Sequence, residues 1–211
     1  MIDIFLHLDK YLEIVISQYG TLTYVLLFLV VFMETGFVVT PFLPGDSLLF
    51  AAGALSATTS LNVWVVYILL LVAAVLGDTI NYWIGHFIGP KVFEKDTKFI
   101  KKEYLDKAHH FYEKHGDKAI VLARFIPIVR TFAPFVAGIA KMTYGHFIAY
   151  NIIGGVAWVT LFVWGGYFFG NLPVVKENFH YVVLIIIILS LVPIIYEWLQ
   201  HTRKKVSSGH S

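Results

Sequence analysis

Long apolar runs separated by short polar stretches dominate the chain. Four of these runs approach the roughly 20 apolar residues that a helix needs to cross a bilayer: 22–33, 63–77, 147–170 and 181–199. The pattern therefore predicts an all-α polytopic membrane protein with about four transmembrane helices.

Two further apolar segments, 34–57 and 119–142, are interrupted by residues that break helices. The residues expected to form the breaks are Pro41, Pro44 and Gly45 in the first segment, and Pro127, Pro134 and Gly138 in the second. Proline removes a helix hydrogen bond, and irregular backbone is tolerated at membrane depth only inside protein or beside water. We therefore expect two re-entrant helical hairpins, each entering the membrane and leaving on the same side.

Composition agrees with a membrane protein. Hydrophobic residues make up 58% of the 211 positions, charged residues only 14%, and the mean hydropathy is +0.73, which lies outside the usual range of soluble domains. The chain has no cysteine, which excludes disulfides and thiolate metal sites. No basic patch is interleaved with exposed aromatic residues, so a nucleic-acid partner is not expected.

The one strongly charged stretch, 91–118, contains eight lysines among its 28 residues. Its apolar positions recur at close to helical spacing, which favours an amphipathic helix on the membrane surface; a solvated helical linker is the alternative. The positive-inside rule places this stretch and the basic tail, 201–211, in the cytoplasm. The N-terminal segment lacks the basic cluster of a signal peptide, so we expect it to be retained.

An internal echo relates the two halves of the chain. FAAGA at 50–54 matches FVAGI at 135–139, and WIGHFIG at 83–89 matches WGGYFFG at 164–170. The matches predict a single membrane domain built of two repeats, about 12–89 and 119–170, followed by a transmembrane helix at 179–200. If the first span runs from the cytoplasm to the outside, the first hairpin enters from outside and the second from the cytoplasm, which gives the repeats inverted topology. In that architecture, broken segments from both halves meet near the midplane and form a transport site.

Five ionisable residues lie inside apolar segments: Glu34, Asp46, Asp78, Arg124 and Arg130. Each costs roughly 2.5–3.5 kcal/mol at a lipid-facing helix centre, so five cost about 12–18 kcal/mol. We therefore expect them to face one another or a water-filled cavity, with the acidic hairpin against the basic one.

The chemistry of these residues leaves several roles open. Arg124 and Arg130 are suited to clamp a phosphate, because the planar guanidinium donates parallel hydrogen bonds and keeps its charge; they can also act only as structural ion-pair partners. Glu34 and Asp46 either carry protons or balance the arginine charge. Asp78 either joins them or hydrogen-bonds to Thr79 and Asn81 within the bundle.

No metal site or cofactor is expected. His109, His110 and His115 lie in the charged stretch without a metal-ligand set. None of the nine histidines falls in either hairpin, and lipid phosphatases need a nucleophile or a positioned histidine beside the arginines. An enzyme is therefore not the expected class.

Three motifs carry a resemblance to a known family. They are ETGFVVTPFLPGDSLL at 34–49, GDTINYWIG at 77–85 and RFIPIVRTFAPFVAGIAKM at 124–142. With them, the chain resembles the DedA family of bacterial inner-membrane proteins, part of the wider VTT (SNARE-associated) group. The resemblance covers about 34–170 and implies a multi-pass protein of the cytoplasmic membrane with two opposed re-entrant hairpins.

The resemblance also implies a function. Family members are implicated in translocating lipids such as undecaprenyl phosphate or phosphatidylethanolamine, with dependence on the proton gradient. The acids that the family requires fall on Glu34 and Asp46, and the required arginines on Arg124 and Arg130. The expected partners are a membrane lipid phosphate and protons, with a homo-oligomer possible. A proton-coupled transporter of ions or small solutes and a membrane lipid phosphatase are the alternatives.

Overall fold

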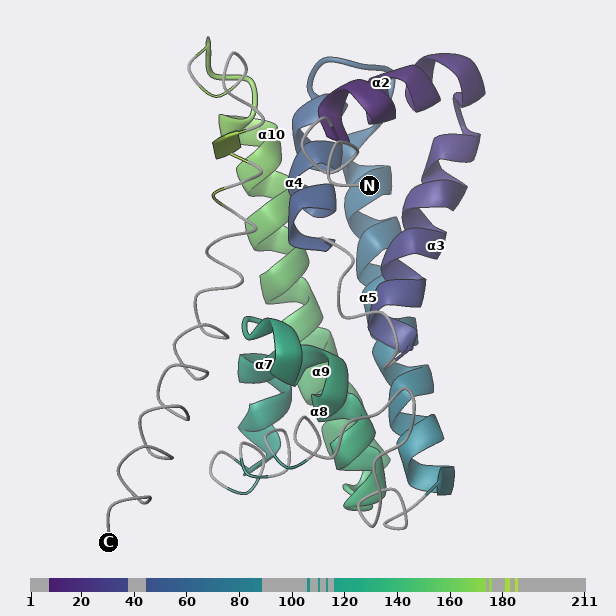
Figure 1. Ribbon diagram of the computed structural model, residues 1–211, viewed down its shortest axis with the longest axis vertical. Coiled ribbons are helices and arrows are strands. Elements are labelled where there is room, and N and C mark those ends of the chain that lie inside the picture. The colour runs from purple at the N-terminus through teal and green to yellow at the C-terminus, as the bar shows by residue number, and fades with distance from the viewer. Residues whose placement is uncertain are drawn as a thin grey trace, which may run out of the picture.

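The computed structural model describes residues 8–37, 45–88 and 116–173, together with isolated positions between 106 and 113 and between 175 and 185. Within these ranges every regular element is helical (Figure 1). Pro41 and Pro44, most of the charged stretch 91–118, most of the expected helix 179–200 and the tail 201–211 lie outside the described residues.

Two helices run the length of the molecule. The first is α5, Val63–Ile88. The second comprises α9, Tyr144–Val159, a π-helical turn η3, Thr160–Trp164, and α10, Gly165–Phe169. Each contains 26 residues and is long and apolar enough to cross a membrane. A helix of 26 residues extends about 39 Å.

The N-terminal part of the fold contains three shorter helices: α2, Leu8–Tyr19; α3, Leu22–Gly36; and α4, Gly45–Ser56. In Figure 1, α3 runs from the upper end of the molecule to mid-height, and α4 runs from mid-height back to the upper end. With 15 residues, α3 is about 22 Å long, too short to cross a bilayer alone.

This arrangement differs from the expectation that 22–33 crosses the membrane and that 34–57 forms a separate hairpin. The structure makes α3 the first arm of a helix pair and α4 the second arm. The physical reason lies at Glu34, which is 4% exposed and ends the apolar run inside the protein rather than in lipid.

A second helix pair lies in the lower half of Figure 1. A short 3-10 turn η2, Gly116–Lys118, leads into α7, Ala119–Ala123, and α8 follows at Pro127–Ile139. Pro127 begins α8 at its first turn, where its missing N–H group would have no partner in the helix anyway. Residues 124–126 therefore form the turn of this pair.

Two of the residues expected to break the second hairpin do not do so. Pro134 and Gly138 both lie within α8, which continues through them. A proline inside a helix removes one backbone hydrogen bond, and α8 keeps the rest. Gly138 serves packing instead: a Cβ atom there would collide with the carbonyl oxygen of Tyr82 in α5. In the first pair, Gly45 does lie at the break, as the first residue of α4.

Glycines pack the arms of one pair against the long helix of the other half. In α4, a Cβ atom at Gly53 would meet the carbonyl oxygen of Val163, and one at Gly166 of α10 would meet that of Phe50. The helices approach so closely because glycine has no side chain, as is common in membrane proteins.

The same contacts recur between α8 and α5. A Cβ atom at Gly85 would meet the carbonyl oxygen of Phe135, just as one at Gly138 meets Tyr82. Phe50 and Gly53 occupy in FAAGA the positions of Phe135 and Gly138 in FVAGI, and Gly85 and Gly166 are also equivalent in the echo. The internal repeat therefore corresponds to a repeated packing contact: α4 packs against α10, and α8 packs against α5 in the same way.

Aromatic side chains gather at both ends of the long helices. The rings of Trp64 and Trp164 lie 4.9 Å apart near the start of α5, and those of Trp83 and Tyr144 lie 5.3 Å apart near its end. Trp64 and Trp83 are separated by 19 residues of one helix, or about 28 Å. This spacing is close to the roughly 30 Å thickness of a bilayer core, where tryptophan and tyrosine mark the two interfaces.

Candidate functional site

Arg130 joins both helix pairs. It lies in the first turns of α8, and its Nη1 atom donates to Asp46 Oδ1 at 2.6 Å. Its Nη2 atom donates to Glu34 Oε1. Since Glu34 is near the end of α3 and Asp46 near the start of α4, one guanidinium group holds the tips of the α3–α4 pair against α8.

A glycine completes the contact at Glu34. The backbone N–H of Gly45 donates to Glu34 Oε1 at 3.3 Å. Any Cβ atom at position 45 would collide with the same carboxylate. The glycine therefore lets the backbone at the start of α4 approach the acid directly. The other carboxylate oxygen, Oε2, is buried and has no hydrogen-bond partner among the described residues.

Arg124 occupies the turn between α7 and α8 and faces the two long helices. Its Nη2 atom donates to Asp78 Oδ2 of α5 at 2.6 Å and to Asn151 Oδ1 of α9. Asn151 is held in turn, because its Nδ2 atom donates to the Val75 carbonyl oxygen at 3.1 Å. A Cβ atom at Gly154 would lie 3.0 Å from Arg124 Cδ, so the small residue provides room for the arginine stem.

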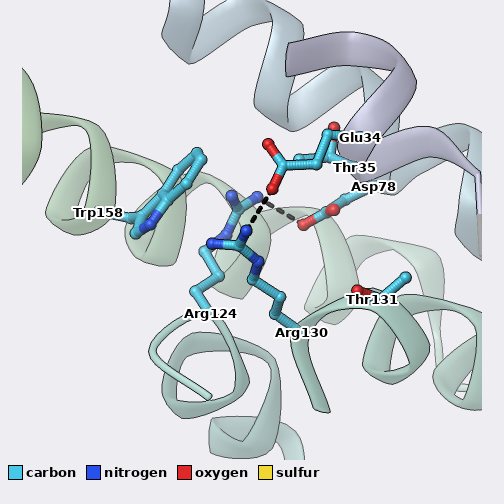
Figure 2. A pocket seen from close by; sticks show the side chains of 7 residues that line it. All are labelled: Glu34, Thr35, Asp78, Arg124, Arg130, Thr131 and Trp158. Atoms are coloured by element: carbon cyan, nitrogen blue, oxygen red, sulfur yellow. Dashed lines mark hydrogen bonds and ion pairs between the residues drawn. The ribbon is translucent and has the colours of Figure 1, made fainter. Parts of the chain in front are cut away.

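Trp158 of α9 lies beside both arginines. The guanidinium carbon of Arg124 is 5.9 Å from the indole ring centroid, and that of Arg130 is 5.3 Å away. At these distances each cation is attracted to the π-face of the ring. The indole Nε1 atom also donates to Asp46 Oδ1 at 2.9 Å. Figure 2 shows the guanidinium groups between the indole on one side and Glu34 and Asp78 on the other.

Asn81 connects the two helix pairs through residues next to the charged ones. Its side-chain Nδ2 atom donates to the backbone oxygen of Thr35 at 3.3 Å and to that of Thr131 at 2.8 Å. Thr35 follows Glu34, and Thr131 follows Arg130. A fully buried amide of α5 therefore fixes the spacing between the backbones that carry this acid and this base.

Two spaces adjoin the charged cluster. The first is a small cavity of about 10 Å³, lined by Glu34, Thr35, Asp78, Arg124, Arg130, Thr131 and Trp158; this is room for about one water molecule. The second is an open groove of about 490 Å³. Two charged residues, Asp46 and Arg124, line the groove. Its other lining residues are mainly apolar: Phe50, Phe125, Trp158, Leu161, Phe162, Gly165, Phe169 and Val182.

The structure brings together all five charged residues that the sequence singled out, with Glu34 and Asp46 on Arg130 and Asp78 on Arg124. The alternative prediction, in which Asp78 hydrogen-bonds to Thr79 and Asn81, is wrong. Thr79 donates to the Val75 carbonyl oxygen, and Asn81 donates to backbone oxygens. Asp78 pairs with a base instead because a buried carboxylate needs an opposite charge.

Sequence reasoning missed Trp158, Asn151 and the bridging role of Asn81. The two asparagines carry a signal, since a polar amide inside an apolar run needs a buried partner. Trp158 carries no such sequence signal, because tryptophan is common in apolar runs. Among the described residues, no group of three or more histidine, aspartate or glutamate side chains is arranged to hold a metal ion.

Comparisons with known proteins identify the family. The VTT domain matches residues 43–168. Protein DedA of Escherichia coli (strain K12) is 52% identical over 206 residues, covering 96% of this chain and 94% of its own length. The chain belongs to the DedA family. The match includes Asp46, Asp78, Arg124, Arg130 and Trp158, and so most of the charged cluster is inside the family's domain.

Other DedA relatives are more distant. An uncharacterized membrane protein of Mycobacterium tuberculosis (strain ATCC 25618 / H37Rv) is 45% identical over 168 residues, covering 78% of this chain and 74% of its own length. Inner membrane protein YqjA of Escherichia coli (strain K12) is 36% identical over 159 residues, covering 75% and 72%. No solved structure matches the chain. Family membership and the two long apolar helices together make this a membrane protein.

Proposed function

We propose that this DedA protein is a transporter that moves a lipid phosphate, such as undecaprenyl phosphate or a phospholipid, across the bacterial cytoplasmic membrane. One observation carries the proposal: Arg124 lines both the small charged cavity and the open apolar groove. A molecule with an anionic head and a long apolar tail fits this arrangement. Its head group binds at the arginines while its tail lies along the groove.

The exposed side chains of the groove support a lipid tail. Phe125, Leu161 and Phe169 are 44%, 57% and 60% exposed. They face the space that a hydrocarbon chain would fill, and a lipid tail there stays in apolar surroundings, as it does in the bilayer. A small inorganic ion would gain nothing from these side chains. The groove therefore favours a lipid over a simple ion or a small solute.

Charge balance supports coupling to protons. Three carboxylates surround two guanidinium groups in the cluster, so an added phosphate would leave an excess of negative charge in a buried site. In this proposal the phosphate replaces Glu34 and Asp46 on Arg130, and the displaced acids take up protons. Burying an uncompensated charge would otherwise cost several kcal/mol.

The placement in the membrane follows from the two aromatic ends. We propose that the ring pairs Trp64–Trp164 and Trp83–Tyr144 lie at opposite interfaces, so that the charged tips of both helix pairs meet inside the bilayer. Each pair is then a re-entrant hairpin, and the two halves form an inverted repeat. The lysine-rich stretch 91–118 and the C-terminus face the cytoplasm in this orientation.

We propose transport rather than phosphate hydrolysis. Among the described residues that line the small charged cavity, the hydroxyl groups belong to Thr35 and Thr131, and histidine, serine and cysteine are absent. The Thr35 hydroxyl donates to the Val31 carbonyl oxygen at 2.9 Å. A phosphatase needs an activated nucleophile beside the arginines, whereas the Thr35 hydroxyl donates its hydrogen to the backbone of its own helix.

A reconstituted assay tests the proposal. Purified protein in phosphatidylcholine vesicles would receive a trace of fluorescently labelled polyprenyl phosphate, and dithionite quenching from outside would report how fast the label crosses. We expect Arg124→Ala/Arg130→Ala to reduce crossing to the rate of protein-free vesicles. Lys118→Ala removes an exposed cation outside the cluster and should match the unaltered protein.

Three results would each point elsewhere. Unchanged crossing in a folded double arginine variant would reject the arginines as the binding site. Released inorganic phosphate would indicate an enzyme. A proton or ion flux of equal size without any lipid phosphate would favour the transporter of small solutes.

A further inference from the structure

Trp158 stands between the two spaces at the site. Its side chain lines the small charged cavity and also the open groove. Only 1% of the residue is exposed, so it fills the boundary rather than projecting from it. Arg130 lines the cavity but not the groove, so a head group in the groove has to pass Trp158 or Arg124 to reach it.

The indole is held by two kinds of contact. Its ring lies against the guanidinium groups of Arg124 and Arg130, and its Nε1 atom donates to Asp46 Oδ1. That same carboxylate oxygen accepts from Arg130 Nη1. Asp46 is thus fixed from two directions, by a base from α8 and by an indole from α9.

We propose that Trp158 is a positioning residue that closes the passage between groove and cavity by holding Asp46 on Arg130. The inference rests on the proposed function, since it assigns the regulation of that site. The hydrogen bond from Nε1 to Asp46 and the ion pair from Arg130 to Asp46 open together when a head group enters. The freed indole N–H then donates to a phosphate oxygen, which is an acceptor of the same kind as the carboxylate oxygen that it loses.

The long helix that carries Trp158 is irregular close to this residue. The π-helical turn η3 begins at Thr160, two residues after Trp158, and it interrupts the regular hydrogen bonding of the long helix. Such turns are frequent at functional sites. The helix beyond the turn is anchored separately, because Gly166 of α10 packs on the Phe50 carbonyl oxygen of α4. Trp158 lies in α9, on the other side of this turn from the contact between α10 and α4.

The absence of cysteine from the natural sequence makes a direct test possible. Thr131 lines the cavity behind Trp158 and is 4% exposed, so Thr131→Cys places a single thiol there. The probe is 2-aminoethyl methanethiosulfonate, added to protein in phosphatidylcholine vesicles without lipid phosphate. Trp158→Phe keeps a ring and loses the N–H donor. We expect it to raise the labelling rate about tenfold, the effect of losing one hydrogen bond to a charged group.

Two further variants separate closure from general loosening. Trp64→Phe changes an exposed tryptophan near the start of α5 that lines neither space, and labelling should stay at the rate of Thr131→Cys alone. In an Asp46→Ala background the acceptor is missing, so Trp158→Phe should add nothing to labelling. A purely structural role for Trp158 would instead give effects that add.

The decisive outcome is independent of lipid transport. Equal labelling with and without Trp158→Phe, in proteins that remain monodisperse and unfold at the same temperature, would overturn the inference even if the arginines prove essential for crossing. Trp158→His is the second variant if Trp158→Phe does not fold. It keeps a ring N–H donor, so labelling should stay at the slow rate of Thr131→Cys alone. Fast labelling in a folded Trp158→His protein would also overturn the inference. Conversely, lipid crossing that survives Arg124→Ala/Arg130→Ala would reject the proposed function while leaving this labelling result intact.

Discussion

Arg130 Nη1 lies 2.6 Å from Asp46 Oδ1, although the two residues are 84 positions apart in the chain. Their ion pair joins α8 to the start of α4, where the two helix pairs meet. Buried ion pairs add little net stability compared with apolar residues of the same size, yet breaking one is costly. The contact is therefore better explained by what the charges do at the site than by stability alone.

Arg130→Ala should strongly destabilise the protein. The change leaves Glu34 and Asp46 buried without their base, which typically costs about 3–5 kcal/mol in the free energy of unfolding. Thermal unfolding in detergent micelles would measure the loss. The triple variant Arg130→Met/Glu34→Gln/Asp46→Asn removes all three charges and should recover most of the stability, but it should not move lipid phosphate. A triple variant as unstable as Arg130→Ala would contradict this account.

Lysine should not replace Arg130. Its guanidinium group contacts Glu34 and Asp46 through different nitrogen atoms, whereas a lysine ammonium is a single point charge. We expect Arg130→Lys to lower lipid crossing about tenfold or more, since it loses one charge-assisted hydrogen bond. The vesicle assay measures this, with Lys118→Arg as the reverse change at an exposed site. Full activity of Arg130→Lys would show that charge alone suffices.

The glycine contacts between the halves should be sensitive to a single methyl group. Gly85→Ala places a Cβ atom against the Phe135 carbonyl oxygen, and Gly53→Ala places one against that of Val163. Each should lower the free energy of unfolding by about 1–3 kcal/mol, the usual cost of overpacking.

Gly165 is the matched control for these glycines. It lies at the start of α10, and a Cβ atom there meets nothing within 4 Å. Gly165→Ala should therefore be neutral or raise stability by up to about 1 kcal/mol through helix propensity. Equal losses at positions 165 and 85 would argue against close helix packing as the cause.

Asn81→Ala should loosen the site without touching a charge. The change leaves the Thr35 and Thr131 carbonyl oxygens without this donor, and two lost hydrogen bonds cost about 2 kcal/mol. We expect slower lipid crossing together with lower thermal stability. Thr79→Ala, on the same helix, removes only a hydroxyl that bonds back to Val75, and it should change stability by no more than about 0.5 kcal/mol.

Single cysteines can report the orientation in the membrane. Thr58 and Lys118 are exposed. Thr58 comes shortly after α4, which ends in the upper part of Figure 1, and Lys118 directly precedes α7, which lies in the lower half. In intact cells, a membrane-impermeant maleimide should label Thr58→Cys from outside and should leave Lys118→Cys unlabelled until the cells are opened. The opposite pattern would reverse the proposed orientation.

The sequence alone determined the class of the protein and the chemistry available to it. Apolar runs of bilayer length, the breaks at Gly45 and Pro127, the internal echo and five misplaced charges are all visible without coordinates, because lipid and buried charge impose strict costs on every position. Those costs also required the charges to meet, although they do not say in which pairs.

Only the tertiary structure decided the pairs and the boundaries. Apolar helices are nearly interchangeable toward lipid, so hydropathy does not reveal that α3 is an arm of a helix pair. That assignment comes from close packing, in which glycines meet carbonyl oxygens of the other half and bring Glu34 to Arg130. Trp158 depends on the same packing, because its position beside two arginines and its hydrogen bond to Asp46 arise only when α4, α7, α8 and α9 come together.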